Sequence, residues 1–162
     1  YFNADSLYKR FTPAGPDHAQ IAASAGLADY VDALFAHHGG TGGEAAVKAA
    51  AVHDLSREYE TKLLQPLLDY LAGRNDLRLI GPRDAAAKAP TVAVALDEPG
   101  NDVATRLARH GIMASGGDFY AVRLLEALGV PLEKGVLRMS FVHYTTRAEI
   151  DQLIAALDAE LG

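Results

Sequence analysis

The chain contains no cysteine, and this absence excludes several kinds of site at once. Disulfides, thiolate metal sites and a cysteine nucleophile all need a sulfur atom that none of the 162 residues supplies. A chain without disulfides is compatible with a reducing compartment, and we expect the protein to be cytoplasmic.

Long apolar runs and concentrated positive charge are also missing. No stretch approaches the ~18 apolar residues that a membrane helix requires, and no basic segment precedes an apolar one as in a signal peptide. The net charge is −6 and the basic residues are scattered, whereas a nucleic-acid-binding face needs a basic stripe. The six histidines form no set with metal-ligand spacing. We therefore expect no membrane, nucleic acid or metal as a partner.

Hydrophobic residues make up 49% of the chain and charged residues 22%, which favours a folded domain with a buried core. The length suits one domain, or a small domain together with part of another. Because the chain opens at Tyr1 rather than at Met, we expect it to be a piece of a longer protein.

The first half of the chain is predicted to be helical. Asp17 is a candidate N-cap of a helix that reaches His38, and the glycines of 39–43 end that helix. These glycines follow a helix, whereas a phosphate-binding loop follows a strand, so we interpret 39–43 as a linker. A second helix is predicted over 44–72, with a kink or a restart at Pro66. Its apolar side is predicted to contain Leu55, Tyr59, Leu63, Leu64, Leu67, Leu68 and Leu71.

From Leu77 onward, short strands alternate with short helices. The predicted order is strand 77–80, strand 91–96, helix 102–110 capped by Asn101, strand 112–114 running into 115–117, helix 119–128, strand 136–142 and a last helix that starts at the capping box Thr146–Glu149. This order favours a small α+β domain with helices over one face of a sheet. We divide the chain into 1–43 and 44–162, and we expect helix 17–38 to pack on a domain outside this chain.

Arg138 lies within the apolar strand 136–142. Alternation places Leu137 and Met139 on one face of the strand and Arg138 on the other. The residue is interpreted either as a solvated arginine on an exposed sheet face or as a guanidinium that binds a carboxylate through two parallel hydrogen bonds.

The segment 115–120 is predicted to be a turn between a strand and a helix. Its glycines permit close approach of another chain or of a ligand. A tight connection in which Asp118 caps the following helix explains the same residues, and both interpretations stay open.

Three segments together resemble the class V aminotransferases, in particular the cysteine-desulfurase-like subgroup. Residues 137–153 are similar to the C-terminal signature of that family, which is an arginine, a short apolar strand, Tyr-Asn-Thr and an acidic start to a leucine-rich helix. Residues 9–18 resemble a segment that follows the cofactor lysine, and residues 117–121 resemble a Gly-x-x-Tyr-Ala loop.

The resemblance implies the C-terminal portion of a fold-type-I enzyme that is a homodimer and uses pyridoxal phosphate to act on an amino acid. Residues 44–162 would form its small C-terminal domain, a mixed or antiparallel sheet with helices on one face. Residues 1–43 would be the end of the large domain. The implied substrate-binding residues are Arg138, which would bind the α-carboxylate, Tyr120, Ser115 and Asp118. The implied cofactor contacts are Gly15, Asp17 and His18.

The chain departs from the family pattern at several positions. It has no cysteine for a persulfide, Gly15 stands where the family has a phosphate-binding threonine, and Thr145 replaces an asparagine. The cofactor lysine is expected upstream of Tyr1, so we expect this chain alone to be inactive and not to bind the cofactor by itself. The alternative is a non-catalytic α+β module that binds a partner.

Overall fold

The computed structural model describes residues 17–162, and the chain divides into two compact units whose boundary lies between Leu55 and Ser56. The division at residue 43 that the sequence suggests stays a prediction. In order, the elements are α2 (His18–Ala23), α3 (Ala25–His37), α4 (Ala45–Ala72), β1 (Leu77–Ile80), β2 (Thr91–Leu96), α5 (Gly100–Leu107), β3 (Ser115–Gly117), α6 (Val122–Ala127), β4 (Val136–Ser140) and α7 (Arg147–Leu161). Within the described part of the chain, no helix combines the length and the apolar character that crossing a membrane demands.

The helix expected over 17–38 is interrupted at one residue. Asp17 caps its start as predicted, because a carboxylate oxygen accepts a hydrogen bond from the backbone N–H of Gln20 at 3.1 Å. At Ser24 the side-chain hydroxyl donates to the carbonyl of Ile21 at 2.6 Å, and α2 gives way to α3 there. Serine hydroxyls compete with helical hydrogen bonds in this way, and the interpretation as one continuous helix was wrong.

Helix α4 runs without a break from Ala45 to Ala72 and contains Pro66. The helix therefore does not restart at Pro66. The leucines predicted for its apolar side are buried from Leu63 onward, whereas Leu55 and Tyr59 are exposed. The hydroxyl of Tyr59 donates to the carbonyl of Thr145 at 3.0 Å, so its polar end has a partner at the surface.

The strands form one antiparallel sheet in the order β1-β2-β4-β3. One row of paired residues across it is Ile80, Ala93, Arg138 and Ser115, and the next is Leu79, Val94, Leu137 and Gly116. Side chains in neighbouring rows point to opposite faces of the sheet, so the first row and the second lie on different faces. The sequence of elements and the antiparallel sheet confirm the predicted α+β class.

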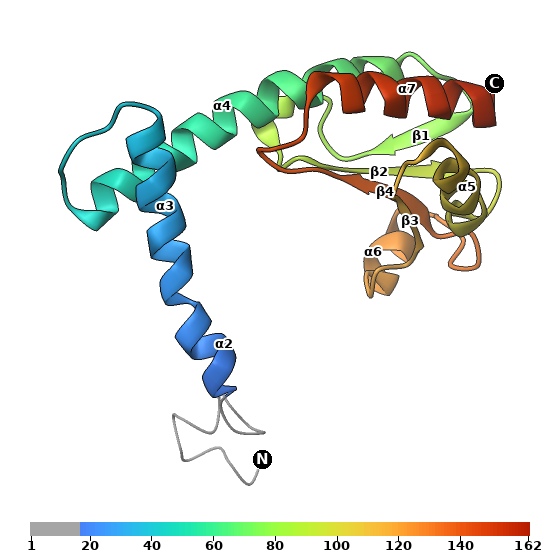
Figure 1. Ribbon diagram of the computed structural model, residues 1–162. Coiled ribbons are helices and arrows are strands. Elements are labelled where there is room, and N and C mark those ends of the chain that lie inside the picture. Colours follow the sequence, from blue (N-terminus) through green and yellow to red (C-terminus); the bar gives the residue numbers. More distant parts are fainter. Residues whose placement is uncertain (1–16) are drawn as a thin grey trace, which may run out of the picture. The chain divides into compact units, whose positions relative to one another are not determined.

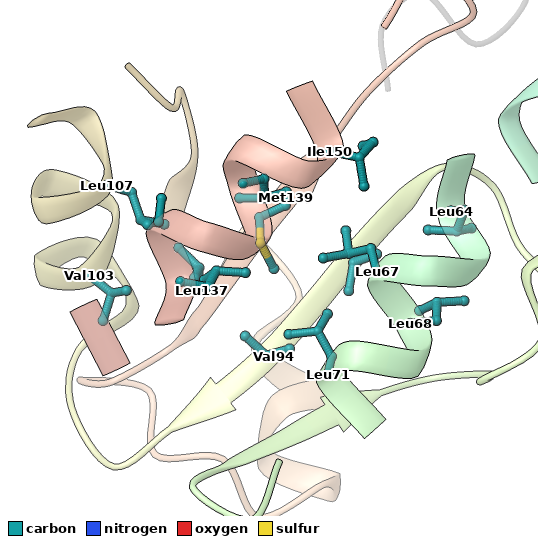
Figure 2. Close-up of a cluster of buried hydrophobic side chains, with 14 of the residues drawn as sticks. Leu64, Leu67, Leu68, Leu71, Val94, Val103, Leu107, Leu137, Met139 and Ile150 are labelled. Carbon is teal, nitrogen blue, oxygen red and sulfur yellow. The ribbon is translucent and has the colours of Figure 1, made fainter. Parts of the chain in front are cut away.

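The main core lies on the face of the sheet that contains Leu137. Figure 1 shows the C-terminal half of α4 and helix α7 over this face, and Figure 2 shows leucines of α4 meeting side chains of β2, β4, α5 and α7. Both Leu67 and Leu137 are 0% exposed, so the centre of this core is closed to solvent. The largest completely buried side chains are Leu64, Leu67, Leu68, Leu71, Leu107, Leu137, Ile150, Leu157, Val92, Val94 and Val103.

Helix α7 begins at the predicted capping box. The Thr146 hydroxyl accepts from the backbone N–H of Glu149 at 3.3 Å, and a Glu149 carboxylate oxygen accepts from the backbone N–H of Thr146 at 2.6 Å. The predicted apolar face of this helix is confirmed, with Ile150, Leu153 and Leu157 buried. The capping box thus fixes where the helix starts and which side of it faces the sheet.

The opposite face of the sheet is partly covered by α6, which the sequence did not indicate (Figure 1). A small cluster there contains buried Leu125, Val130 and Val136. Several element boundaries also differ from the prediction. The third strand is 115–117 rather than 112–114, and β4 ends at Ser140 rather than at 142. Helix α6 is shorter than 119–128, and Asn101 lies inside α5, whose N-cap is Pro99.

Candidate functional site

Arg138 is on the open face of the sheet, as strand alternation predicts. Its neighbours on β4 in the sequence, Leu137 and Met139, are 0% and 2% exposed, while Arg138 itself is exposed. Across the strands it pairs with Ala93 of β2 and with Ser115 of β3. The small side chains of both neighbours leave the long arginine side chain room to extend over this face.

The guanidinium of Arg138 lies over an aromatic ring. Its Cζ is 3.9 Å from the centre of the Phe119 ring, which is a cation–π contact. Within residues 17–162, Arg138 forms no salt bridge and no hydrogen bond through its side chain. The arginine therefore has a defined contact for its flat face, while its N–H groups have no protein acceptor in this part of the molecule.

The loop after β3 brings Phe119 to this position through an unusual backbone. Phe119 has φ 51° and Tyr120 has φ 60°, and they are the two non-glycine residues with positive φ in the described part of the chain. Such a conformation costs on the order of 1 kcal/mol or more for each residue. Asp118 supports the loop, because its carboxylate accepts from the backbone N–H of Tyr120 at 2.9 Å. This hydrogen bond closes a turn, so Asp118 does not cap α6 as the sequence suggested.

Glycines allow three backbone segments to meet beneath this loop. A Cβ on Gly116 would collide with the backbone of Gly100 and Asn101 at the start of α5. A Cβ on Gly135 would collide with the backbone of Gly117. The glycines at 116 and 135 therefore serve close packing between backbone segments of this chain, a use that the sequence did not indicate.

The four residues predicted to bind substrate lie on two adjacent strands and the loop that follows one of them. Ser115 is paired with Arg138, and Asp118 and Tyr120 belong to the loop that supplies Phe119. Tyr120 is fully exposed at 102%, so its side chain does not contact Arg138 in this structure. The structure therefore places Ser115 beside Arg138, whereas the side chain of Tyr120 extends into solvent.

Of the residues predicted to contact the cofactor, those that the structure describes do not belong to the compact unit that contains Arg138. Gly15 lies outside the described residues, and Asp17 and His18 lie at the start of α2 in the other compact unit. One oxygen of the Asp17 carboxylate already caps α2, and its negative charge disfavours a phosphate at the same helix end. Contact of Gly15, Asp17 and His18 with pyridoxal phosphate stays a prediction.

Phe119 was not singled out from the sequence as a partner of Arg138. An aromatic residue after two glycines was visible, but the contact depends on positive φ at Phe119 and Tyr120, which such residues rarely adopt. The separation of residues 119 and 138 along the sequence does not indicate that their side chains are in contact. The register of β3 with β4 and this backbone conformation together bring the two residues into contact.

Comparison with known proteins agrees with the resemblance seen in the sequence. Residues 41–153 match the family model of the class V aminotransferases. A curated cysteine desulfurase from Pectobacterium atrosepticum is 36% identical over 155 residues, which cover 95% of this chain and 32% of that enzyme. The chain thus spans about a third of the length of this relative.

Solved structures show the same fold. The cysteine desulfurase CsdA from Escherichia coli matches with a TM-score of 0.56 and 28% identity, over 76% of this chain and 32% of that chain. The apo cysteine desulfurase from Thermococcus onnurineus matches with a TM-score of 0.62 at 22% identity, over 72% of this chain and 28% of that chain. Because the family model covers well over half of the chain, the protein belongs to the class V aminotransferase family.

Proposed function

We propose that the full-length protein is a pyridoxal-phosphate-dependent enzyme that acts on an amino acid, and that Arg138 binds the substrate α-carboxylate. The observation that carries this proposal is an exposed arginine whose N–H groups have no acceptor within residues 17–162. A planar guanidinium is suited to bind a carboxylate through two hydrogen bonds. Membership of the family supports an amino-acid substrate as the source of that carboxylate.

When the cofactor is bound, it withdraws electrons from the substrate α-carbon, and the protein orients the reacting groups. Arg138 would hold the carboxylate, and Ser115 on the adjacent strand has a hydroxyl that can donate to the same group. Sulfur transfer through a cysteine of this chain is excluded by composition. Transamination, a lyase reaction and racemisation remain the reaction classes to test.

We also infer that residues 1–162 alone are inactive, because they span about a third of the length of a curated cysteine desulfurase relative. Turnover of any amino acid by the isolated chain with added cofactor would refute this inference. The family further supports a homodimer as the assembled enzyme, which sedimentation or light scattering of the full-length protein would test.

The experiment begins with the absorbance spectrum of the full-length protein, purified without added cofactor. A visible band that borohydride abolishes, with the label on a lysine, supports the enzyme. A colourless protein that cannot be reconstituted contradicts it and favours the binding module.

The role of Arg138 is tested by Arg138→Ala in the full-length protein. We expect loss of the preference for L-alanine over L-alaninamide, which lacks the carboxylate. Arg78→Ala is the matched control, because Arg78 lies on the same face of the sheet but donates to the carbonyl of Leu128 at 2.8 Å.

A further inference from the structure

The contact between Phe119 and Arg138 restricts the conformation of the guanidinium without using its N–H groups. An arginine on an exposed sheet face has many rotamers, and a binding site needs one of them. A protein carboxylate could fix the guanidinium, but it would occupy the N–H groups that a substrate carboxylate needs. An aromatic ring attracts the cation through its face and leaves the N–H groups at the guanidinium edge free.

Phe119 is held firmly enough to serve this purpose. Its ring is half-buried and packs against the cluster formed by Leu125, Val130 and Val136. These residues come from α6, the turn that follows it and β4, so the ring is fixed from several elements. A ring fixed in this way holds the position of any group that stacks on it.

The loop backbone is adapted to the same end. Phe119 and Tyr120 both adopt positive φ, and the Asp118 carboxylate stabilises that turn through the backbone N–H of Tyr120. Unfavourable backbone conformations persist where the surrounding structure fixes them, and they concentrate at functional sites. Here the conformation turns the Phe119 side chain to the sheet and the Tyr120 side chain to solvent.

We propose that Phe119 is a positioning residue that preorganises Arg138 for the substrate carboxylate, with Asp118 fixing the loop that carries the ring. The proposal rests on the proposed role of Arg138. It adds a side chain whose chemistry is apolar and which contacts no reacting group. Its effect is to raise the affinity for a carboxylate without changing the charge of the site.

The first experiment tests the stack without reference to activity. In the full-length protein, the Nε–H and Cδ protons of Arg138 should show ring-current shifts by NMR, assigned through their loss in Arg138→Lys. Phe119→Leu removes the ring but keeps an apolar side chain on the cluster, and it should abolish these shifts. Phe119→Tyr should retain them. Unshifted Arg138 resonances in the wild-type protein would overturn the proposal.

The second experiment measures binding of L-alanine and of L-alaninamide to the holoenzyme by calorimetry. Phe119→Leu should weaken L-alanine binding roughly 2- to 5-fold, the range that a cation–π contact supports at an exposed site, and should leave L-alaninamide binding almost unchanged. Phe119→Tyr should restore the wild-type ratio. Leu124→Ala, on the exposed side of α6 and outside this cluster, is the control for a side chain lost elsewhere on the same helix.

The outcomes separate this inference from the proposed function. If Arg138→Ala abolishes the carboxylate preference and Phe119→Leu leaves it intact, Phe119 is not a positioning residue and the role of Arg138 stands. If Arg138→Ala leaves the preference intact, the proposed carboxylate site is wrong and this inference fails with it. If Leu124→Ala lowers the preference as much as Phe119→Leu does, the effect is general loosening of this region, which also overturns the proposal.

Discussion

Gly135 and Gly117 lie against each other, and a Cβ on Gly135 would stand 2.6 Å from the carbonyl carbon of Gly117. This contact joins the turn before β4 to the end of β3. Gly117 is followed directly by the loop that carries Phe119. The packing of the Gly135 backbone on the Gly117 backbone therefore helps to fix the position of the loop that carries Phe119.

Replacing Gly135 by alanine should destabilise the protein by about 1–3 kcal/mol for the overpacking alone. The reason is that the new methyl group would collide with the Gly117 backbone, which cannot move without shifting β3. Urea unfolding followed by circular dichroism measures the change. Gly129→Ala is the matched control, because Gly129 has a similar φ of 64° but a methyl group there would meet no atom within 4 Å. Equal losses in the two variants would mean that backbone strain, and not packing, explains the effect.

Arg74 joins the ends of α4 and α7, and Arg74→Ala should lower the free energy of unfolding by about 1–3 kcal/mol. Its side chain is 16% exposed and donates to Asp158 at 3.0 Å and to the carbonyl of Leu161 at 3.1 Å. Thermal and urea unfolding check the value. Lys62→Ala, in the exposed i,i+4 pair with Glu58, should change stability by less than about 0.5 kcal/mol. A comparable change in the two variants contradicts the prediction.

The core prediction concerns Leu67, which is 0% exposed. Leu67→Ala should cost about 2–5 kcal/mol, because it removes buried methyl groups and leaves a cavity between α4 and the sheet. Leu124→Ala, at a position that is 56% exposed on α6, should stay within about 0.5 kcal/mol of the wild type. Denaturant midpoints of the two variants, measured side by side, decide the question. A small loss at Leu67 would mean that this core does not close as described.

The pH dependence of stability should reflect Glu98. The hydrogen bonds from Arg106, at 2.7 and 2.8 Å, lower the pKa of the Glu98 carboxyl below its ordinary value, with burial opposing the shift. A carboxyl whose pKa is lower in the folded state stabilises the protein above the unfolded pKa, and the effect disappears as the pH falls through the folded pKa.

The stability difference between the wild type and Glu98→Gln should therefore be constant above about pH 5.5 and shrink below about pH 4.3. Thermal midpoints between pH 3 and pH 7 measure it. Asp97→Asn is the control, since Asp97 is an exposed neighbour without an ion pair in the region 17–162. A difference that does not vary with pH would show that Glu98 acts through packing alone.

The elements that were predicted correctly are those whose signals are local. Strands 77–80 and 91–96 are apolar runs between turn residues, and the Thr146 capping box is complete in four residues. The leucines of α4 from Leu63 onward repeat every three or four positions, and they are the residues that meet the sheet. In these places the short-range chemistry and the tertiary structure agree.

The errors arise where tertiary packing overrides local preference. The apolar segment 112–114 was predicted as a strand, yet pairing with β4 begins only at Ser115. Gly116 and Gly117 belong to strand β3, although glycine does not favour strands. Glycine is required at position 116 because the start of α5 packs directly against its backbone. The candidate site shows the same limit. The exposed face of Arg138 follows from alternation, but its stack on Phe119 requires positive φ at two consecutive residues, and no local signal specifies it.

The two outer strands of the sheet have a consequence for association between copies of the protein. Strand β1 has four residues and β3 has three, and two of the three in β3 are glycines. Unpaired strand edges recruit strands from other molecules, and short edges offer them few hydrogen bonds. Gly117, with φ 138°, departs from an extended strand and ends the edge of β3. The same glycines that bring the loop to Arg138 therefore also protect this small sheet from edge-to-edge aggregation.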